Sequence, residues 1–147
     1  MGPEQQRILT QLGVPAHRII IGHCCRTDDR EYHLDIARQG SYLGFDQFGI
    51  EMLISDEARV ASLVALIGSG AGDRVVVSHD SALCWRGEPI PPGLTSSIGP
   101  HAFDPTHFWT HIVPRLRDAG VDDRAIDRLV VENPRRFFEG SHLDALA

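Results

Sequence analysis

The chain has 147 residues, which suits one domain or part of a larger one. Its 20 acidic and 14 basic side chains give a formal net charge of −6, with no basic cluster longer than Arg135-Arg136, so the composition excludes a protein that binds nucleic acid through its phosphates. Apolar runs of about five residues are too short to cross a bilayer, and three cysteines, two of them adjacent, do not make a disulfide framework, so we expect a cytoplasmic protein with no membrane partner.

The first eighty residues alternate between helical and strand-like patterns. Residues 18–24 contain a short β-branched run that suits a strand buried on both faces. In chain order, the patterns predict a helix over 3–12, a strand over 18–24, a helix over 29–38 opened by Asp28, a strand over 41–46, a helix from Ser55 to about 67, and a strand over 74–80. Strands that alternate with helices imply parallel pairing, so the expected fold class is α/β.

The second half of the chain opens with a long aperiodic stretch. Residues 81–105 carry five of the nine prolines and predict a loop, a kind of segment that is often functional. Asp104-Pro105 then predicts the start of a helix over 106–118 that Pro114 interrupts. A further helix is expected from Asp122 or Asp123 to about 131, and Asn133-Pro134 is expected to cap a last turn. No linker is visible, so residues 1–147 are expected to form a single domain.

Each predicted strand ends in a polar residue that could do chemistry: His23, Asp46 or Asp80. In parallel α/β folds, ligands bind at the carboxyl ends of strands, so three such residues in succession favour a site there. His23 and Asp80 suit zinc and similar divalent metals, and a carboxylate beside a metal can also accept a proton from water. The alternative is structural, because such residues commonly cap the next helix or form hydrogen bonds at the rim of the core.

The other histidines are weaker candidates. His79 is expected to point away from Asp80, since side chains alternate along a regular strand. His107 and His111 have the spacing of helical metal ligands, but Phe108 stands where the metalloprotease motif needs a glutamate. We therefore expect these two, with His101, to be surface residues.

Cysteine and tryptophan side chains leave two further alternatives open. Cys24 and Cys25 are expected to be buried, inert thiols rather than a redox or metal-handling pair. Trp85 lies in the long loop just after Asp80, where it either lines a substrate pocket or anchors the loop by apolar burial.

Five segments, in order from about residue 5 to 139, resemble the phosphotriesterase family of the amidohydrolase superfamily. The segments are IGH (21–23) with TDD (27–29), LGFDQFGI (43–50), VVSHD (76–80), VPRLRDAGV (113–121) and ENPRRFF (132–138). The first three resemble the sixth, seventh and eighth strand regions of the family, and the last two resemble its C-terminal helices. The resemblance implies that this chain is the C-terminal part, strands six to eight with their helices, of a (β/α)8 TIM barrel.

The family's chemistry, carried over by this resemblance, is metal-dependent hydrolysis. Two divalent metal ions, zinc first with manganese, cobalt or iron as alternatives, hold a hydroxide that attacks a lactone, ester or organophosphate. His23 matches a ligand of the more exposed metal, and Asp80 matches a ligand of the more buried metal and the proton acceptor. Gln47 and Trp85 are implied to contact substrate, with 81–105 as the specificity loop. Members of the family are often homodimers.

The chain also departs from the family pattern. Gln47 replaces the His of organophosphate-degrading members and the Arg of lactonase-like members, and Arg26 replaces an acidic residue. The His-x-His pair of strand one, the bridging Lys or Glu of strand four and the His of strand five do not appear, so the chain alone is expected to lack a complete site. The alternative function is a non-catalytic barrel fragment or interaction module that pairs through its open sheet edges.

Overall fold

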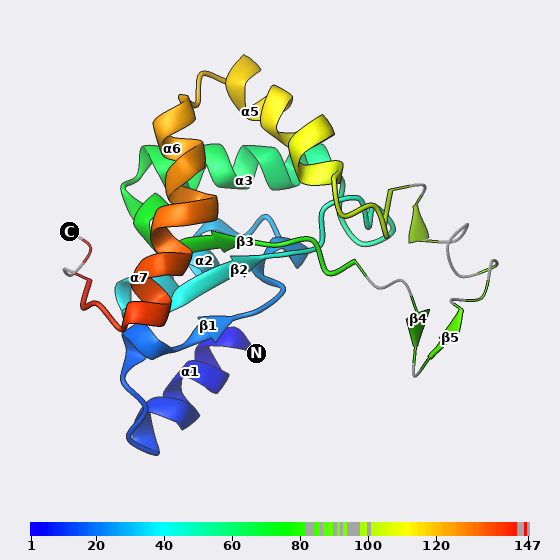
Figure 1. Cartoon of the computed structure of the whole chain (residues 1–147). Coiled ribbons are helices and arrows are strands. Elements are labelled where there is room, and N and C mark those ends of the chain that lie inside the picture. Colours follow the sequence, from blue (N-terminus) through cyan, green and yellow to red (C-terminus); the bar gives the residue numbers. More distant parts are fainter. Residues whose placement is uncertain are drawn as a thin grey trace.

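The computed structural model of the chain describes residues 1–81, 84–85, 87–89, 91, 93, 98–99, 101–143 and 146, with residues 84 and 85 described through their backbone alone. A three-stranded sheet lies at the centre, and helices pack around it (Figure 1). The elements of the first half are α1 (Gly2–Gln11), η1 (Ala16–Arg18), β1 (Ile20–Ile21), η2 (Cys24–Arg26), α2 (Arg30–Arg38), β2 (Tyr42–Phe45), α3 (Asp56–Gly68), η3 (Ala71–Arg74) and β3 (Val75–Val77). Those of the second half are β4 (Cys84–Trp85), β5 (Glu88–Pro89), η4 (Phe108–Ile112), α5 (Val113–Asp118), α6 (Asp123–Asp127), η5 (Arg128–Glu132) and α7 (Asn133–Glu139).

The central sheet has the order β1-β2-β3, and both pairings are parallel. Ile21, Leu43 and Val75 are register partners across the three strands, and all three are at most 3% exposed. Helix α2 connects β1 to β2, and α3 connects β2 to β3. The predicted α/β class and parallel pairing are therefore confirmed.

The outer strands are shorter than their sequence patterns predict. Strand β1 keeps two residues of 18–24, and β3 keeps three of 74–80. The flanking residues form the short helical turns η1, η2 and η3. A β-branched run becomes a strand only where a neighbour supplies ladder hydrogen bonds, and β2, with four residues, limits the length over which both outer strands can pair.

Helix starts follow the predicted caps with one correction. The side chain of Ser55 accepts a hydrogen bond from the backbone N–H of Ala58 and opens α3, as expected. Helix α2 is capped by Asp29 rather than Asp28, because Asp29 accepts from the backbone N–H of Tyr32 at 3.1 Å. The two aspartates are adjacent, and composition alone does not separate them.

The C-terminal helices continue through both of their prolines. The π-helical turn η4 precedes α5, which has Pro114 in its first turn, and η5 likewise precedes α7 with Pro134. A widened turn accommodates a residue that lacks an N–H and would clash with the preceding turn of an α-helix. The regular α-helix is thus interrupted next to Pro114, as expected, by a π-helical turn, whereas the expected cap at Asn133 is wrong because Asn133 is the first residue of α7.

Asn133 has a different role from a cap. It is fully buried, and its Nδ2 donates to the backbone oxygens of Gly72 at 2.8 Å and Val75 at 2.7 Å. These two bonds fasten the helix to the start of β3. The position of the helix against the sheet thus depends on a polar side chain inside an otherwise apolar layer.

The loop predicted over 81–105 contains regular structure in its described part. Strands β4 and β5 pair antiparallel, and in Figure 1 they project away from the central sheet. The remaining residues of this segment are described only at some positions, so the expectation of an aperiodic loop is corrected for β4 and β5 alone. No helix in the described part of the chain is long and apolar enough to span a bilayer.

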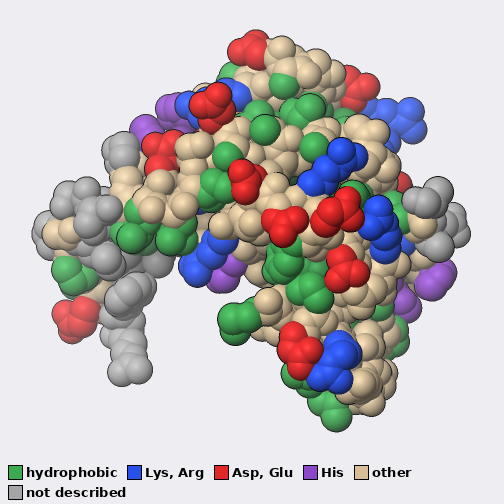
Figure 2. All heavy atoms as spheres, turned by 180° about the vertical axis from the view of Figure 1, so that it is seen from behind, with side chains coloured by type: hydrophobic (Ala, Val, Ile, Leu, Met, Phe, Trp, Pro, Cys, Tyr) green, Lys and Arg blue, Asp and Glu red, His purple; other side chains and the backbone are tan. Residues whose placement is uncertain are grey.

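Charged side chains are mixed on the face of the molecule seen in Figure 2. Acidic and arginine side chains alternate over its middle, and hydrophobic side chains gather at the bottom, over α1. A groove of about 350 Å³ lies between α1 and β1, where Ile8, Leu9 and Ile20 are 37–44% exposed. Isolated exposed apolar residues are ordinary, but a group of them beside a strand edge marks a surface that can take a partner.

Candidate functional site

The ends of β1 and β2 hold a histidine against a carboxylate. His23 follows β1, and Asp46 follows β2. The Nδ1 atom of His23 lies 3.0 Å from Oδ1 of Asp46, and the backbone N–H of His23 donates to Oδ2 at 3.2 Å. An ionised carboxylate only accepts, so Nδ1 carries the proton and Nε2 keeps a free lone pair. The His23 side chain is 47% exposed, which makes that lone pair accessible.

The ends of β2 and β3 are joined by Gln47. Its Nε2 donates to Oδ2 of Asp80 at 2.7 Å, and its Oε1 accepts from Nε of Arg26 at 2.5 Å. The two contacts fix the orientation of the amide, because Oε1 faces a donor and Nε2 faces an acceptor. Gln47 is 3% exposed, so this contact holds Asp80 from within the protein.

His23 and Asp80 share an unusual backbone conformation. They have φ values of 59° and 46°, and they are the two non-glycine residues with positive φ in the part of the chain that the structure describes. Such a conformation costs of order 1–3 kcal/mol per residue and is concentrated at functional sites. The backbone itself therefore singles out the two residues that the sequence predicts as metal ligands.

Polar side chains meet in two pairs at the strand ends. Contacts link His23 to Asp46, and Asp80 to the adjacent Gln47. The side chain of Trp85, predicted to contact substrate, lies outside the described part of the structure, which places only its backbone in β4. Chemical roles for these residues stay predictions.

His79 does not follow the alternation on which its interpretation depended. Strand β3 ends at Val77, two residues before His79, and Asp80 has left-handed backbone geometry. The exposed His79 instead accepts from the backbone N–H of Ser81 at its Nδ1, at 2.9 Å. The premise of a regular strand is therefore wrong here.

Cys24 and Cys25 are buried, as expected. Their exposures are 1% and 0%, and burial raises the pKa of Cys24 to about 12, with Cys25 beside it contributing. Burial also raises the pKa of Cys25. Both thiols are thus protonated at neutral pH, which supports the inert interpretation and weighs against redox chemistry.

A buried charged network supports the loops at the same end of the sheet. Asp56, in the first turn of α3, accepts hydrogen bonds from Arg59 at 2.8 Å and from the backbone N–H of Gly49 at 3.0 Å. Arg59 also donates to the carbonyls of Cys25 and Ile50. Burial raises the pKa of Asp56, but its hydrogen bonds from Gly49, His107 and Arg59 outweigh that effect and leave the pKa lowered.

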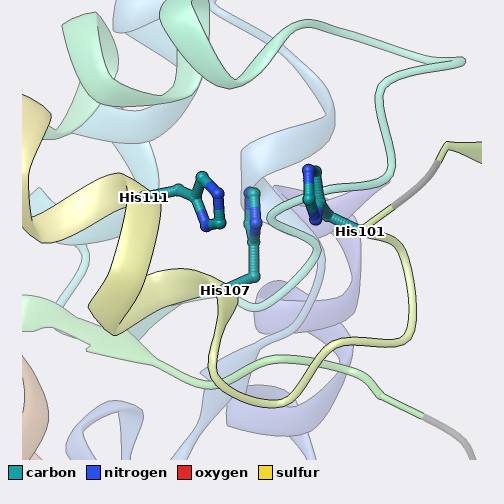
Figure 3. Close-up of side chains that lie close together, drawn as sticks. All are labelled: His101, His107 and His111. Carbon is teal, nitrogen blue, oxygen red and sulfur yellow. The ribbon is translucent and has the colours of Figure 1, made fainter.

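Sequence reasoning missed this network and misplaced His107. Asp56 reads as an ordinary acidic residue of a first helical turn, and no local pattern shows that it is 1% exposed. His107, expected at the surface, is 3% exposed, and its Nε2 lies 2.6 Å from Oδ2 of Asp56. His101 and His111 are half-buried and stack against it (Figure 3). The sequence offers one signal for this cluster, because the three histidines come from one predicted loop and the helix that follows it.

Comparison with known proteins identifies the chain's relatives. A sequence profile described as the phosphotriesterase family matches residues 1–138. The chain belongs to the phosphotriesterase family. The resemblance inferred from the five segments is confirmed.

Members of the phosphotriesterase family agree with this chain in both sequence and structure. A phosphotriesterase homology protein of Mycobacterium tuberculosis is 34% identical over 138 residues, covering 94% of this chain and 41% of that protein. The solved structure of the phosphotriesterase from Mycobacterium tuberculosis superposes with a TM-score of 0.86 at 33% identity, over 94% of this chain and 42% of that one.

Two further members of the phosphotriesterase family carry more specific names. An aryldialkylphosphatase of Saccharolobus solfataricus is 33% identical over 93% of this chain and 43% of its own length. A mutant of a PTE-like lactonase from Deinococcus radiodurans superposes with a TM-score of 0.84 at 34% identity, over 93% of this chain and 44% of that one. The chain thus spans about two fifths of the length of the relatives it matches.

Proposed function

We propose that the protein is a metal-dependent hydrolase of the phosphotriesterase family that acts on a small ester, lactone or organophosphate. In this proposal residues 1–147 supply strands six to eight of a (β/α)8 barrel as one partial domain. The names of two relatives, an aryldialkylphosphatase and a lactonase, support the substrate class. A homodimer and a cytoplasmic location remain predictions from the sequence.

One observation carries the proposal: His23 and Asp80 stand at the carboxyl ends of parallel strands, each held by a neighbouring strand end. Asp46 holds His23, and Gln47 holds Asp80. Parallel α/β folds place their ligands at this edge of the sheet. The positive φ of both residues adds support, because such backbone strain persists where a site needs it.

The donors present fit a divalent metal. His23 offers the lone pair of Nε2 while Asp46 fixes its tautomer through Nδ1, the carboxylate–histidine arrangement that orients metal-binding imidazoles. Asp80 is exposed, and Gln47 engages only its Oδ2, so Oδ1 can face a ligand. Imidazole with carboxylate suits zinc, and manganese, cobalt and iron are the alternatives.

The roles of the residues follow from these contacts. A divalent ion, when bound, would polarise the scissile carbonyl or phosphoryl group and acidify a water molecule. Asp80 would accept a proton at its carboxylate, held in place by the buried amide of Gln47. Arg26 would keep that amide from turning over by donating to its Oε1. This geometry favours a positioning role for Gln47, and its contact with substrate stays a prediction.

The chain supplies only part of the donor set that the proposal needs. The bridging ligand that the family resemblance implies is a carboxylated lysine or a glutamate, and the sequence contains no lysine. Zinc sites generally use three or four protein ligands, and His23 with Asp80 makes two. We therefore propose that a complete site forms together with the remaining strands of the barrel.

The proposal predicts a large loss of turnover for Asp80→Asn. The amide cannot accept the proton that the carboxylate takes, so kcat/KM should fall by about 10²–10⁴-fold. The measurement uses the zinc-loaded protein, as the cell makes it, with an aryl phosphotriester and an aliphatic lactone as substrates. His79→Asn, at the neighbouring exposed position, is the matched control and should keep wild-type turnover. Full activity in Asp80→Asn would exclude Asp80 as the proton acceptor.

The second candidate function is an interaction module without catalysis. It is favoured by the outer edge of β1, which no other strand pairs with in the described residues, and by the apolar groove beside it. Ile20 is 39% exposed at this edge. Metal analysis separates the two functions, because only the hydrolase requires ions that are lost when His23 is replaced.

A further inference from the structure

Three histidines converge at a place separate from His23 and Asp80. His101 lies in the turn before the C-terminal helices, His107 immediately precedes η4, and His111 lies within η4. Figure 3 shows the three imidazole rings facing one another, with ring centroids 4.6–4.7 Å apart in every pair. One ligand nitrogen from each residue lies within 4.8 Å of the other two, the one such group of three among the described residues.

The central imidazole has a buried nitrogen without a partner. His107 is 3% exposed, and its Nδ1 makes no hydrogen bond in the structure. Its Nε2 lies 2.6 Å from Oδ2 of Asp56, and a carboxylate oxygen accepts, so in the neutral imidazole Nε2 carries the proton and Nδ1 keeps its lone pair. A buried acceptor without a partner is unfavourable, and a metal ion at this atom would supply the partner.

His111 is also held in a tautomer that can bind a metal. Its Nδ1 lies 2.8 Å from Oγ1 of Thr110, and that hydroxyl donates its own proton to the carbonyl of Thr106 at 3.1 Å. With its proton directed to Thr106, the hydroxyl accepts from Nδ1–H, and this tautomer leaves the lone pair on Nε2 of His111. Two of the three imidazoles thus have their protons turned toward the protein.

Asp56 holds the central histidine of the cluster in the way that carboxylates hold metal-binding histidines. A metal-binding histidine nearly always donates its other ring N–H to a carboxylate or carbonyl, which orients the ring. Asp56 does this for His107 and is itself fixed by Arg59 and by the backbone N–H of Gly49. The support behind His107 is therefore of the kind found behind metal ligands.

Two glycines let His101 reach the cluster. Gly49 has φ of +85°, and a Cβ built on it would lie 2.5 Å from the backbone oxygen of His101. Gly99 has φ of +127°, and a Cβ there would lie 2.6 Å from the backbone oxygen of Gly49. Any side chain at either position would push His101 away from the loop that follows β2.

We propose that His101, His107 and His111 bind a divalent transition-metal ion of the zinc class. Three imidazoles suit zinc, copper or nickel and leave one coordination position for water. The terminal torsion of histidine is broad, so modest rotations of His101 and His111 would aim their lone pairs at a point in front of Nδ1 of His107. The ion would fasten the turn at His101 to η4, next to the loop that carries Gln47.

The test compares two pairs of histidine replacements in the protein as the cell makes it. Zinc affinity and stoichiometry are measured by competition with a chromophoric chelator for wild type, His101→Ala/His111→Ala and the control His17→Ala/His142→Ala. The control pair also has its rings in contact, 5.3 Å apart, but lies elsewhere. We expect the first pair to lose one zinc per chain with an affinity drop of more than about 100-fold, since loss of an outer-shell partner alone costs 10–100-fold. The control should bind as wild type.

His23→Ala separates this site from the proposed active site. This variant should keep the zinc ion of the three-histidine cluster. The two proposals can therefore fail independently, and zinc stoichiometry shows which of them has failed. If the double variant folds poorly, the single variant His111→Gln is compared with wild type by X-ray absorption at the zinc edge. Wild type should show imidazole nitrogens at about 2.0–2.1 Å from zinc, and the number of these nitrogens should be lower in the variant. Wild-type zinc stoichiometry and affinity in the double variant, or no imidazole scattering in wild type, would overturn the proposal.

Discussion

Single side chains at the carboxyl ends of the strands work as pairs in this protein. Asp46 fixes the tautomer of His23, and Gln47 fixes the position of Asp80. In each pair one partner is at least partly shielded from water while the other is exposed. A shielded partner strengthens a hydrogen bond because it lies in a medium of lower dielectric constant than water. The chemistry proposed for His23 and Asp80 therefore depends on residues that need not touch substrate.

His33 is a buried histidine with a structural role. It is 1% exposed, and its Nε2 lies 2.8 Å from the carbonyl of Cys24, which connects α2 to the turn after β1. Burial lowers the pKa of His33 from 6.5, although the contact with Cys24 acts in the opposite direction. The unfolded chain therefore binds a proton more readily than the folded chain does.

Because the pKa of His33 is lowered in the folded protein, we expect the free energy of unfolding to decrease in mild acid. Its contribution is complete above pH 6.5 and is lost as the pH falls from 6.5 through the lowered pKa of the folded state. Within that window a single proton changes the free energy of unfolding by at most about 1.4 kcal/mol per pH unit. Urea unfolding of wild type and His33→Gln between pH 7.5 and 5 measures this slope. The slope should shrink in His33→Gln and persist in the exposed control His142→Gln; an unchanged slope would assign the effect to other groups.

At the scale of elements, helices and strands are joined by a few buried polar contacts. Arg59 of α3 donates to carbonyls that follow β1 and β2, and Asn133 of α7 donates to carbonyls at the start of β3. Apolar packing against the sheet is non-directional, so it does not choose between neighbouring positions of a helix. Hydrogen bonds to particular carbonyls do make that choice.

Asn133→Ala tests this view of α7. The change removes both hydrogen bonds that Nδ2 donates, although the Gly72 carbonyl keeps a second donor, the backbone N–H of Val75, so the free energy of unfolding should fall by about 1–3 kcal/mol. Urea denaturation followed by circular dichroism measures it. Arg135→Ala, on the exposed side of the same helix, should change stability by less than about 0.5 kcal/mol. Equal effects of the two substitutions would mean that Asn133 does not fasten the helix.

At the scale of the whole molecule, the central feature is a short parallel sheet, one edge of which is unpaired among the residues that the structure describes. Strand β1 lies at one side of the sheet beside the groove formed with α1, and Ile20 is partly exposed there. A complete barrel has no edges, whereas an open sheet offers unpaired backbone groups to another strand. The solution behaviour of the 147-residue chain should therefore reflect this edge.

We expect the 147-residue chain, purified by itself, to self-associate as its concentration rises. Ile20→Lys should shift the equilibrium toward monomer, because a charge beside the edge opposes both apolar contact and strand pairing. Sedimentation velocity over a range of concentrations measures the shift. Leu53→Lys, at another exposed apolar position, is the control and should behave as wild type. A chain that stays monomeric throughout would argue against pairing through β1.

The sequence alone predicts the α/β class, the order of helices and strands as far as β3, the resemblance to the family, and polar residues at the ends of the three strands. These follow from local patterns and from parallel pairing, since consecutive strands of one sheet end at the same edge. Only the tertiary structure shows how long β1 and β3 are, how the C-terminal helices accommodate their prolines, and that His107 is buried. Each depends on partners distant in the chain, such as Asp56, which lies 51 residues before His107. Local composition does not predict such contacts, because aspartate and histidine are also common at exposed helix ends.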